Sequence, residues 1–412
     1  MRFSDYRISR ELKANLEEMG FSRPTDIQFK CIPNIQNGED VLAIAQTGTG
    51  KTAAFAIPII DKIQFARKIP GKEGISCIIM VPTRELATQI TEVFHKIGRN
   101  TKVKTIAVYG GVDQDPQIAR LTAGVDVLVT TPGRMFDLVS QGHIKLDRIQ
   151  TLVLDEADQM LNLGFYKDIV DLIRFLPKHR QTLFFSATID AKIKKLAYSL
   201  VNSAAIRIQI SPKNPVSKNV THALTFVEMD DKRFFLERFL KEKEDLKFIV
   251  FVRTKVRAER VKSAMERVGI ETSTIHGDKE QKDREAVLSD FKAGKIRILV
   301  ATDVSARGID IPNVDYVINY DMPDVAENYV HRVGRTGRGR NKGQAISFCA
   351  KEERPLLKEI EDYISVPIEV LTTDRAEYED TILFSDDGTN NWKALIRNDE
   401  ADKLKRRKKK KK

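Results

Sequence analysis

Short apolar runs rich in valine and isoleucine recur along most of this chain, with helical patterns between them. Thr151–Leu154 and Phe248–Val252 are such runs, and Arg84–Ile97 and Arg257–Val268 are helical patterns. Runs that are apolar on both faces are typical of strands buried in a parallel sheet under helices. The alternation predicts an α/β fold. The expected strands are Asp40–Ile44, Cys77–Val81, Lys104–Val108, Asp126–Val129, Thr151–Leu154, Thr182–Phe185, Ala205–Ile210, Leu224–Glu228, Phe248–Val252, Thr272–Ile275, Arg297–Val300, Tyr316–Asn319 and Gln344–Phe348.

A polar segment with two prolines, Ser211–Ser217, divides these runs into two sets. Such a composition is typical of a linker, and each side is long enough for one domain. We therefore predict a first domain over residues 1–210, a linker over 211–221 and a second domain over 222–370. After about Val370 the strand signals stop. Residues 371–412 are predicted to form a polar and then Lys/Arg-rich tail that is mostly disordered.

Charge and cysteine content narrow the class of protein. The net charge is +11, but nine positive charges lie in Lys403–Lys412, and only +2 remains without them. Cys31, Cys77 and Cys349 form no CxxC pair, which favours a reducing compartment and argues against a zinc site. No apolar run reaches the roughly 18 residues of a membrane span, and the first residues lack a signal-peptide pattern. We expect a cytoplasmic protein with no membrane partner.

A glycine-rich turn follows the first expected strand, at the sheet edge where parallel sheets bind ligands. Its residues are Ala45, Gln46, Thr47, Gly48, Thr49, Gly50, Lys51 and Thr52. The turn is a phosphate-binding loop, although the strict pattern has glycine in place of Ala45. Backbone N–H groups and the start of the next helix face phosphate, Lys51 reaches the β- and γ-phosphates, and the Thr52 hydroxyl holds Mg²⁺. A Gly/Thr turn without a ligand is the plainer alternative, which the preceding strand and the Gly-Lys-Thr sequence disfavour.

Two carboxylates follow the expected strand Thr151–Leu154. Asp155 is predicted to hold Mg²⁺, partly through water, and Glu156 to orient and deprotonate the attacking water. On its own, an Asp-Glu pair after a strand is often a solvated turn or a helix start. The phosphate-binding loop upstream favours the catalytic interpretation. Ser186 and Thr188 end another expected strand and could relay the state of the phosphates, although a lone Ser-Ala-Thr means little.

Taken together, these motifs resemble those of the DEAD-box RNA helicases of helicase superfamily 2. The resemblance covers about Phe3 to Tyr363 and rests on motifs in a fixed order. They are Gly20–Gln28, the phosphate-binding loop, Pro82–Ala87, Gly110–Gly111, Thr131–Arg134, Asp155–Asp158, Ser186–Thr188, Val250–Thr254, His276–Asp278, Gln281 with Arg284, Ala301–Asp310 and His331–Arg338. Ser305 and Val333 stand where the family often has alanine and isoleucine. The short N-terminus and minimal core are most similar to the bacterial RhlE-like group.

The resemblance implies two tandem RecA-like domains, each a mostly parallel sheet with helices on both faces, and ATP as the nucleotide. Gln28 would read the adenine edge, because its amide offers both a donor and an acceptor, with Phe21 and Arg23 around the base. Gly308 and Asp310 are implied as further nucleotide contacts, with Asp310 at the ribose. The implied coupling residues between the sites are Asp158, Ser186, Thr188 and His331.

The second half has no phosphate-binding loop, so we expect one ATP per chain. Arg335 and Arg338 are predicted to meet the charge that develops on the γ-phosphoryl group. Because these arginines belong to the other domain, the site would be complete only after the domains close. Hydrolysis would then depend on a conformational step.

By the same resemblance, RNA lies across both domains on the face away from ATP. The implied contacts are Arg84, Gly110, Gly111, Thr131, Gly133 and Arg134 in the first domain and Arg253, Gly277, Arg284 and Thr302 in the second. Arginines and N–H groups bind phosphate without reading bases, and 2′-hydroxyl contacts favour RNA over DNA. We expect single-stranded RNA or short duplexes as partners, with local, non-processive unwinding. Ribosomal or ribonucleoprotein particles are further expected partners, and the chain is expected to be a monomer.

Alternatives stay open at this point. One function is an RNA-dependent ATPase that unwinds short duplexes, and another is an ATP-gated RNA clamp that rarely turns over. Intact Glu156, Arg335 and Arg338 favour the first, and Asp158 and Gln28 disfavour a DNA translocase. The basic tail is either a solvated segment or a tether that neutralises RNA phosphates.

Overall fold

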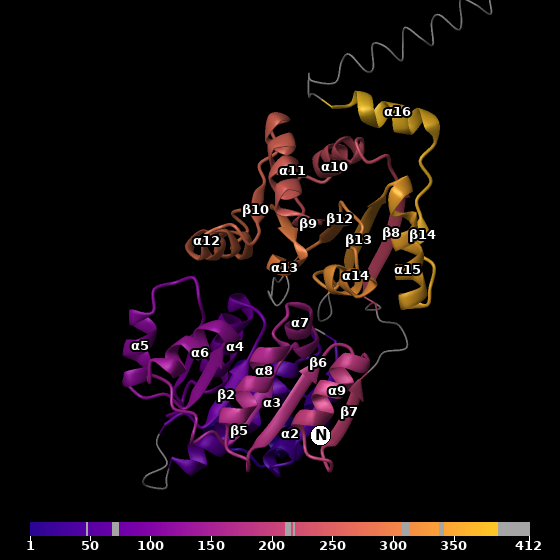
Figure 1. Ribbon diagram of the computed structural model, residues 1–412. Coiled ribbons are helices and arrows are strands. Elements are labelled where there is room, and N and C mark those ends of the chain that lie inside the picture. Colours follow the sequence, from indigo (N-terminus) through magenta and orange to yellow (C-terminus); the bar gives the residue numbers. More distant parts are fainter. Residues whose placement is uncertain are drawn as a thin grey trace, which may run out of the picture. The chain divides into compact units, whose positions relative to one another are not determined.

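The computed structural model describes residues 1–46, 48–67, 74–210, 216, 219–306, 314–337 and 342–385, apart from the side chain of Val304. Two compact units divide the chain after Pro215. Each contains a seven-stranded sheet whose strand pairs are all parallel, with helices on both faces (Figure 1). Among the predicted site residues, Thr47, Gly308, Asp310 and Arg338 lie outside the described residues, as does the basic tail.

The first unit has the strand order β3-β4-β2-β5-β6-β1-β7. Its strands are β1 (Val41–Ala45), β2 (Cys77–Met80), β3 (Thr105–Val108), β4 (Val127–Thr130), β5 (Thr151–Leu154), β6 (Gln181–Ser186) and β7 (Ile206–Ile210). Its helices are η1 (Phe3–Asp5), α1 (Arg10–Glu18), α2 (Asp26–Gln36), α3 (Lys51–Ala66), α4 (Arg84–Ile97), α5 (Asp115–Thr122), α6 (Pro132–Ser140), α7 (Ala157–Asn162), α8 (Tyr166–Phe175) and α9 (Ala191–Leu200).

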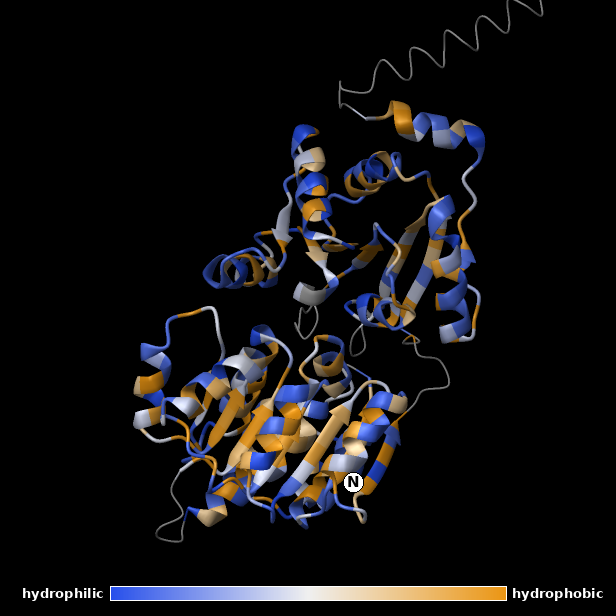
Figure 2. Ribbon diagram, in the orientation of Figure 1, coloured by the Kyte–Doolittle hydropathy of each residue, from blue (hydrophilic) through white to orange (hydrophobic). Residues whose placement is uncertain are grey.

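Strand β1 shows why this sequence forms a sheet covered on both sides. Val41, Ala43 and Ala45 pack with α1 to α4 in one apolar cluster. Leu42 and Ile44 pack with α6 to α9 in a second cluster on the opposite face. All five side chains are buried, and most strands of this unit are largely apolar, whereas β7 includes Arg207 and Gln209 (Figure 2). A continuous apolar run therefore satisfies both faces of the sheet at once.

The second unit has the strand order β10-β11-β9-β12-β13-β8-β14. Its strands are β8 (Val220–Phe226), β9 (Phe248–Val252), β10 (Ser273–Ile275), β11 (Ile298–Thr302), β12 (Tyr316–Asn319), β13 (Gly343–Cys349) and β14 (Glu369–Val370). Its helices are α10 (Lys232–Lys241), α11 (Lys255–Arg267), α12 (Gln281–Lys292), α13 (Asp303–Ala306), α14 (Ala326–Val333), η2 (Lys351–Glu353), α15 (Arg354–Ile364) and α16 (Arg375–Leu383). Helices α10 and α11 pack against Phe248, Val250 and Val252 of β9.

Each expected strand overlaps a strand of the structure, and the largest error in a boundary is at β8. That strand runs over Val220–Phe226 where Leu224–Glu228 was expected, because the polar residues Thr221 and His222 interrupt its apolar pattern yet pair with β13. Val220 and Thr221 were assigned to the linker but lie in this strand. Of the rest of the expected linker, residues 211–215, 217 and 218 lie outside the described residues. No helix among the described residues is long and apolar enough to cross a membrane.

The expectation of disorder after Val370 was wrong for residues 375–383, which form α16. The Asp374 carboxylate caps this helix by accepting the Glu377 N–H at 2.8 Å. The Tyr378 ring packs against Phe235 of α10 at a centroid distance of 4.9 Å, and its hydroxyl donates to Asp231 at 2.9 Å. One aromatic side chain thus anchors a helix whose other residues are mostly polar.

Candidate functional site

The glycine-rich loop after β1 is held close to α2. Gly50 precedes α3 with a φ of 91°, in the left-handed region that favours glycine. A Cβ atom at Gly50 would lie 2.5 Å from Nε2 of Gln28, so a side chain there would push the two segments apart. Lys51 begins α3, and its ammonium donates to the Ala45 carbonyl at 2.9 Å. The loop therefore curls around its own lysine.

Gln28 braces this loop from α2. Its Nε2 donates to the Gly50 carbonyl at 3.2 Å, and its Oε1 accepts the Thr25 N–H at 3.0 Å. The Thr25 hydroxyl donates to the Thr49 carbonyl at 2.8 Å. A glutamine amide has two N–H donors and two acceptor lone pairs. One donor and one lone pair of Gln28 thus remain beyond these two bonds.

Two aromatic rings border the segment that contains Gln28. Phe21 lies edge-on to the buried Phe3 at a centroid distance of 5.8 Å. The Phe3 N–H also donates to the Ser22 carbonyl at 3.3 Å. The chain before α1 is therefore tied to the Phe21 segment. Arg23, the other residue predicted to pack around a base, is exposed.

Asp155 lies at the end of β5, the strand that pairs with β2 and β6. Burial raises the pKa of its carboxyl to about 6, against the opposing effect of the Lys51 ammonium. A buried carboxylate of this kind gains from a nearby cation. Asp155 and the half-buried Thr52 are therefore suitable oxygen ligands for a divalent ion such as Mg²⁺.

Glu156 has an unusual backbone. Its φ of 52° lies in the left-handed region, which costs a non-glycine residue on the order of 1–3 kcal/mol. The side chain is buried, and Oε2 has no hydrogen-bond partner among the described residues. A strained residue that presents an unpaired carboxylate oxygen fits a group that acts on a bound molecule.

Asp158 connects the carboxylate turn to the end of β6. Its Oδ2 accepts the N–H groups of Ala187 and Thr188 at 3.1 and 3.2 Å, and the Thr188 hydroxyl at 3.3 Å. The Ser186 hydroxyl beside it is buried and has no hydrogen-bond partner among the described residues. The structure thus joins Asp158 to Thr188 at the end of β6, two residues after Ser186, and their role in coupling stays a prediction.

A second group of predicted residues meets at the ends of β2, β3 and β4 in the first unit. The guanidinium of Arg84 lies over Gly111, and a Cβ atom there would collide with it. Gly111 has a φ of 77°, so it also needs the freedom of glycine. Arg134 donates to the Val112 carbonyl at 2.9 Å, and the Thr131 N–H donates to Val108 at 3.3 Å. Gly110 directly precedes Gly111, and Gly133 lies in the first turn of α6 beside Arg134.

In the second unit, Arg253 follows β9 directly. Its N–H donates to Asp321 at 3.1 Å, and its guanidinium contacts Glu353 at 3.2 Å and Asp324 at 3.4 Å. Gly277 follows β10 in open space, and Arg284 lies in the first turns of α12. The predicted contacts of this unit therefore lie at or just beyond the carboxyl ends of neighbouring strands.

Ser305 has a structural role that its place in the motif does not reveal. Its hydroxyl donates to the Ile275 carbonyl at 2.7 Å and lies 2.9 Å from the Thr302 hydroxyl. These contacts join the ends of β10 and β11. The alanine that the family often has at this position could make neither bond.

A network of buried charges supports Arg253 and was not predicted. Lys232, fully buried, donates to Glu353 at 2.5 Å and lies 3.8 Å from Asp321. Removing one partner of a buried pair costs on the order of 3–5 kcal/mol. Substitutions at Lys232 or Glu353 would therefore report on folding before they reported on a ligand. No sequence pattern marks Glu353, although a lysine among apolar residues of α10 is a weak sign.

Arg332 joins this network by donating to the Asp321 carbonyl at 2.7 Å, although only its neighbours His331 and Arg335 were assigned roles. It makes two contacts with Asp303, at 2.6 and 2.8 Å, and stacks 5.2 Å from the Phe251 ring centroid. Arg335 lies one turn later, and its Nε donates to the His331 carbonyl at 3.1 Å. The anchored Arg332 thus fixes the turn that carries Arg335.

Comparison with known proteins identifies the family. A family model described as DEAD/DEAH box helicase matches residues 25–196, and one described as helicase conserved C-terminal domain matches residues 231–340. ATP-dependent RNA helicase DbpA of Bacillus subtilis is 40% identical over 367 residues, which cover 89% of this chain and 75% of that protein. ATP-dependent RNA helicase RhlB of Shewanella woodyi is 42% identical over 378 residues, which cover 90% and 85%. The chain belongs to the DEAD-box ATP-dependent RNA helicases.

Solved structures extend the likeness to both units of this helicase. S. cerevisiae Dbp5 bound to RNA and ADP BeF3 is 30% identical with a TM-score of 0.82, covering 92% of this chain and 99% of that one. Mss116p bound to ssRNA and AMP-PNP is 28% identical with a TM-score of 0.82, covering 92% and 80%. The prediction of two tandem RecA-like folds is confirmed. Membership of the RhlE-like group stays a prediction.

Proposed function

We propose that this helicase is an RNA-stimulated ATPase with one ATP site, which unwinds short RNA duplexes locally or remodels ribonucleoproteins. The proposal includes RNA bound without base reading across the strand ends of both units, and a monomeric chain. The observation that carries it is the hydrogen bonding of Asp158 to Ala187 and Thr188. This carboxylate joins the turn that holds Asp155 and Glu156 to the next strand of the sheet.

Hydrolysis would use side chains that the fold already holds in place. Lys51 would leave the Ala45 carbonyl for the phosphates, and Glu156 would take a proton from the attacking water through its unpaired Oε2. Thr52 and Asp155 would hold Mg²⁺, which supplies charge neutralisation for the transferred phosphoryl group. Release of phosphate would then change the turn at Asp158 and, through Thr188, the end of β6.

The second unit would contribute arginines rather than a second nucleotide site. Arg335 and Arg338 would stabilise charge on the γ-phosphoryl group once the units close around ATP and RNA. Asp310 would meet the ribose, and His331 would couple the two ligands. Two relatives support joint binding of nucleotide and RNA, because the Dbp5 and Mss116p structures each contain RNA together with an ATP analogue or ADP BeF3.

Phosphate release and duplex unwinding test the proposal together. With Mg²⁺ and ATP, we expect single-stranded RNA to raise hydrolysis strongly and single-stranded DNA of the same sequence to raise it little. A short RNA duplex should separate during turnover. A rate of ATP hydrolysis that RNA does not change would refute the proposal. RNA that stays bound in the presence of ATP while the duplex is not unwound would favour the ATP-gated RNA clamp.

Purine selection gives a separate prediction at Gln28. Gln28→Ala should reduce the preference for ATP over CTP and UTP, because the amide that can pair with adenine is lost. A bidentate contact of this kind contributes about 1–3 kcal/mol of discrimination, or on the order of tenfold to hundredfold. The measurement is kcat/KM for each nucleotide under saturating RNA.

Thr25→Ala is the matched control for this prediction. It removes the contact with Thr49, which also braces the loop, but takes away no group that faces a base. We expect it to raise KM for all nucleotides by a similar factor. An unchanged nucleotide preference in Gln28→Ala would assign Gln28 to loop support alone.

A further inference from the structure

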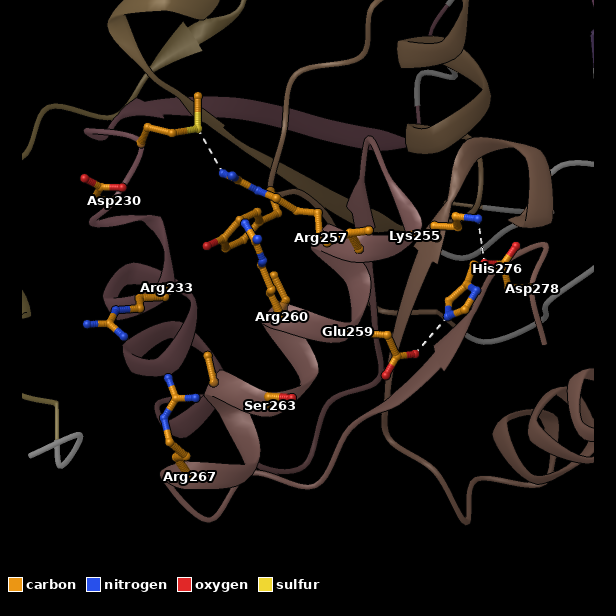
Figure 3. A pocket seen from close by; sticks show the side chains of 15 residues that line it. Asp230, Arg233, Lys255, Arg257, Glu259, Arg260, Ser263, Arg267, His276 and Asp278 are labelled. Atoms are coloured by element: carbon orange, nitrogen blue, oxygen red, sulfur yellow. Dashed lines mark hydrogen bonds and ion pairs between the residues drawn. The ribbon is translucent and has the colours of Figure 1, made fainter. Parts of the chain in front are cut away.

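A basic pocket lies between α10 and α11 of the second unit (Figure 3). Its volume is about 620 Å³. Five cationic and three acidic residues line it, along with apolar side chains. The cationic ones are Arg233, Lys255, Arg257, Arg260 and Arg267. The predicted contacts with nucleotide and RNA include none of these five residues.

The acidic residues on the side of the pocket near β10 are already engaged. Asp278 pairs with Lys255 at 2.6 Å. Glu259 accepts hydrogen bonds from Thr274 and His276 at 2.6 and 2.8 Å, and pairs with Lys279 at 3.2 Å. Partial burial would raise the pKa of Glu259, but these contacts lower it to about 2. Asp278 and Glu259 therefore already pair with lysines, Lys255 and Lys279.

Arg260 differs from these paired residues and from its neighbour Arg257. Arg257 is occupied by Asp321 at 3.2 Å, but Arg260 is exposed and has no polar partner among the described residues. Arg260, Ser263 and Arg267 follow at intervals of three and four, so they share one face of α11. All three are exposed, and a rise of 1.5 Å per residue separates Arg260 from Arg267 by about 10 Å along the helix. This face can contact more than one phosphate.

The pocket is continuous with the strand-end surface proposed to bind RNA. Lys255 follows Arg253 by two residues, and Asp278 follows Gly277 directly. The bonds from Glu259 to Thr274 and His276 fasten α11 to the loop that carries Gly277. These bonds hold α11 against that loop, while Arg260 and Arg267 lie on the side of α11 that faces α10 (Figure 3).

From this continuity, we infer that the pocket between α10 and α11 binds backbone phosphates of RNA that extends past the Gly277 loop. Arg260 and Arg267 provide the main contacts. The inference rests on the proposed RNA-binding function and adds a second stretch of RNA path to it. Contacts of this kind would hold RNA without reading its bases. The path would matter only for RNA longer than the strand-end surface can hold.

The test is RNA binding as a function of length and salt. Uridine oligonucleotides of increasing length are titrated into the full chain and into a double variant, Arg260→Ala with Arg267→Ala. Each phosphate neutralised on a single strand contributes about 0.7 to the slope of log affinity against log salt. With long RNA, the double variant should have a slope shallower by about 1.4. Raising the salt from about 50 to 200 mM should then reduce the ratio of RNA affinities, unaltered protein over double variant, by about sevenfold.

Two controls separate a site from a general charge effect. Lys192→Ala with Lys195→Ala removes two exposed charges from α9 of the first unit, and should leave the length dependence unchanged. Arg260→Lys with Arg267→Lys keeps the charge and should retain most of the slope. Thermal unfolding of each variant confirms that the fold is intact.

Each outcome has one meaning. Short RNA that neither binds the unaltered protein nor stimulates it refutes the proposed function itself. Short RNA that binds normally, with long-RNA curves that coincide for unaltered protein and double variant, overturns the pocket. Polyglutamate that binds the unaltered protein but not the double variant, while the RNA curves coincide, assigns the surface to an acidic peptide and also overturns the inference.

Discussion

Glu156→Gln should bind ATP and RNA normally yet lose hydrolysis by a factor on the order of 10²–10⁴, the usual contribution of a general base. The amide keeps the size of the carboxylate and its buried position, but it cannot take a proton from water. Oε2 of Glu156 makes no hydrogen bond among the described residues, so the substitution breaks no bond at that atom. Single-turnover hydrolysis and equilibrium binding of a fluorescent ATP analogue measure the two effects separately.

Backbone strain makes this prediction more specific. Glu156 lies in the left-handed region at a φ of 52°, and glutamine would have to accept the same conformation. A Gln variant therefore retains the turn that carries Asp155 and Asp158. Glu92→Gln, on the exposed face of α4, removes a similar charge from the same unit and should hydrolyse ATP normally. Near-normal turnover by Glu156→Gln would end the assignment of Glu156 as the base.

The parts of this fold that were predictable from sequence are those specified over short stretches. β5, β9 and β12 have the expected bounds, because each is an unbroken apolar run with polar residues at its ends. Glycine, lysine and threonine in a row, or two carboxylates after a strand, are also local patterns. The structure places Asp155 directly after β5 and Lys51 at the start of α3, the helix that follows β1, as such patterns imply, and the roles of these residues stay predictions.

The interactions that escaped prediction join residues far apart in the chain. Lys232 and Glu353 are 121 residues apart, and Asp303 and Arg332 are 29 apart. Neither pairing has a local pattern, because it depends on which strands become neighbours. Helix α16 was missed for a similar reason: its stability depends on Tyr378 reaching Phe235 and Asp231 of the distant α10 region. Its own sequence is polar and resembles a disordered tail.

The same distinction applies to Arg335. Its position in a motif suggested an arginine that stabilises the transition state, but its anchoring depends on the fold. The Nε donates to the His331 carbonyl at 3.1 Å, and the preceding helix is fixed by the pair of Arg332 with Asp303. An arginine held in this way loses less conformational entropy when it contacts a phosphoryl group than an arginine on a free loop does. Position and support together argue for a catalytic contact.

Arg335→Ala is therefore expected to lower kcat by on the order of 10³ or more, the range found for arginine fingers. Binding of an ATP analogue by the first unit should hardly change, because the phosphate-binding loop is untouched. Arg335→Lys should recover only part of the rate, since an ammonium lacks the planar fork that grips phosphate oxygens. Arg338→Ala should behave alike, although Arg338 lies outside the described residues.

Lys358→Ala provides the control for this loss of charge, because Lys358 is an exposed cation on α15 of the same unit. It should leave kcat unchanged under saturating RNA. The decisive comparison is single-turnover hydrolysis by the Arg335 and Lys358 variants with RNA and ATP both saturating. If the hydrolysis rate of the Arg335 variant becomes normal at saturation, Arg335 contributes to binding of ATP or RNA. A deficit that persists at saturation would place it in the chemical step, because only an interaction gained in the transition state lowers kcat at full occupancy.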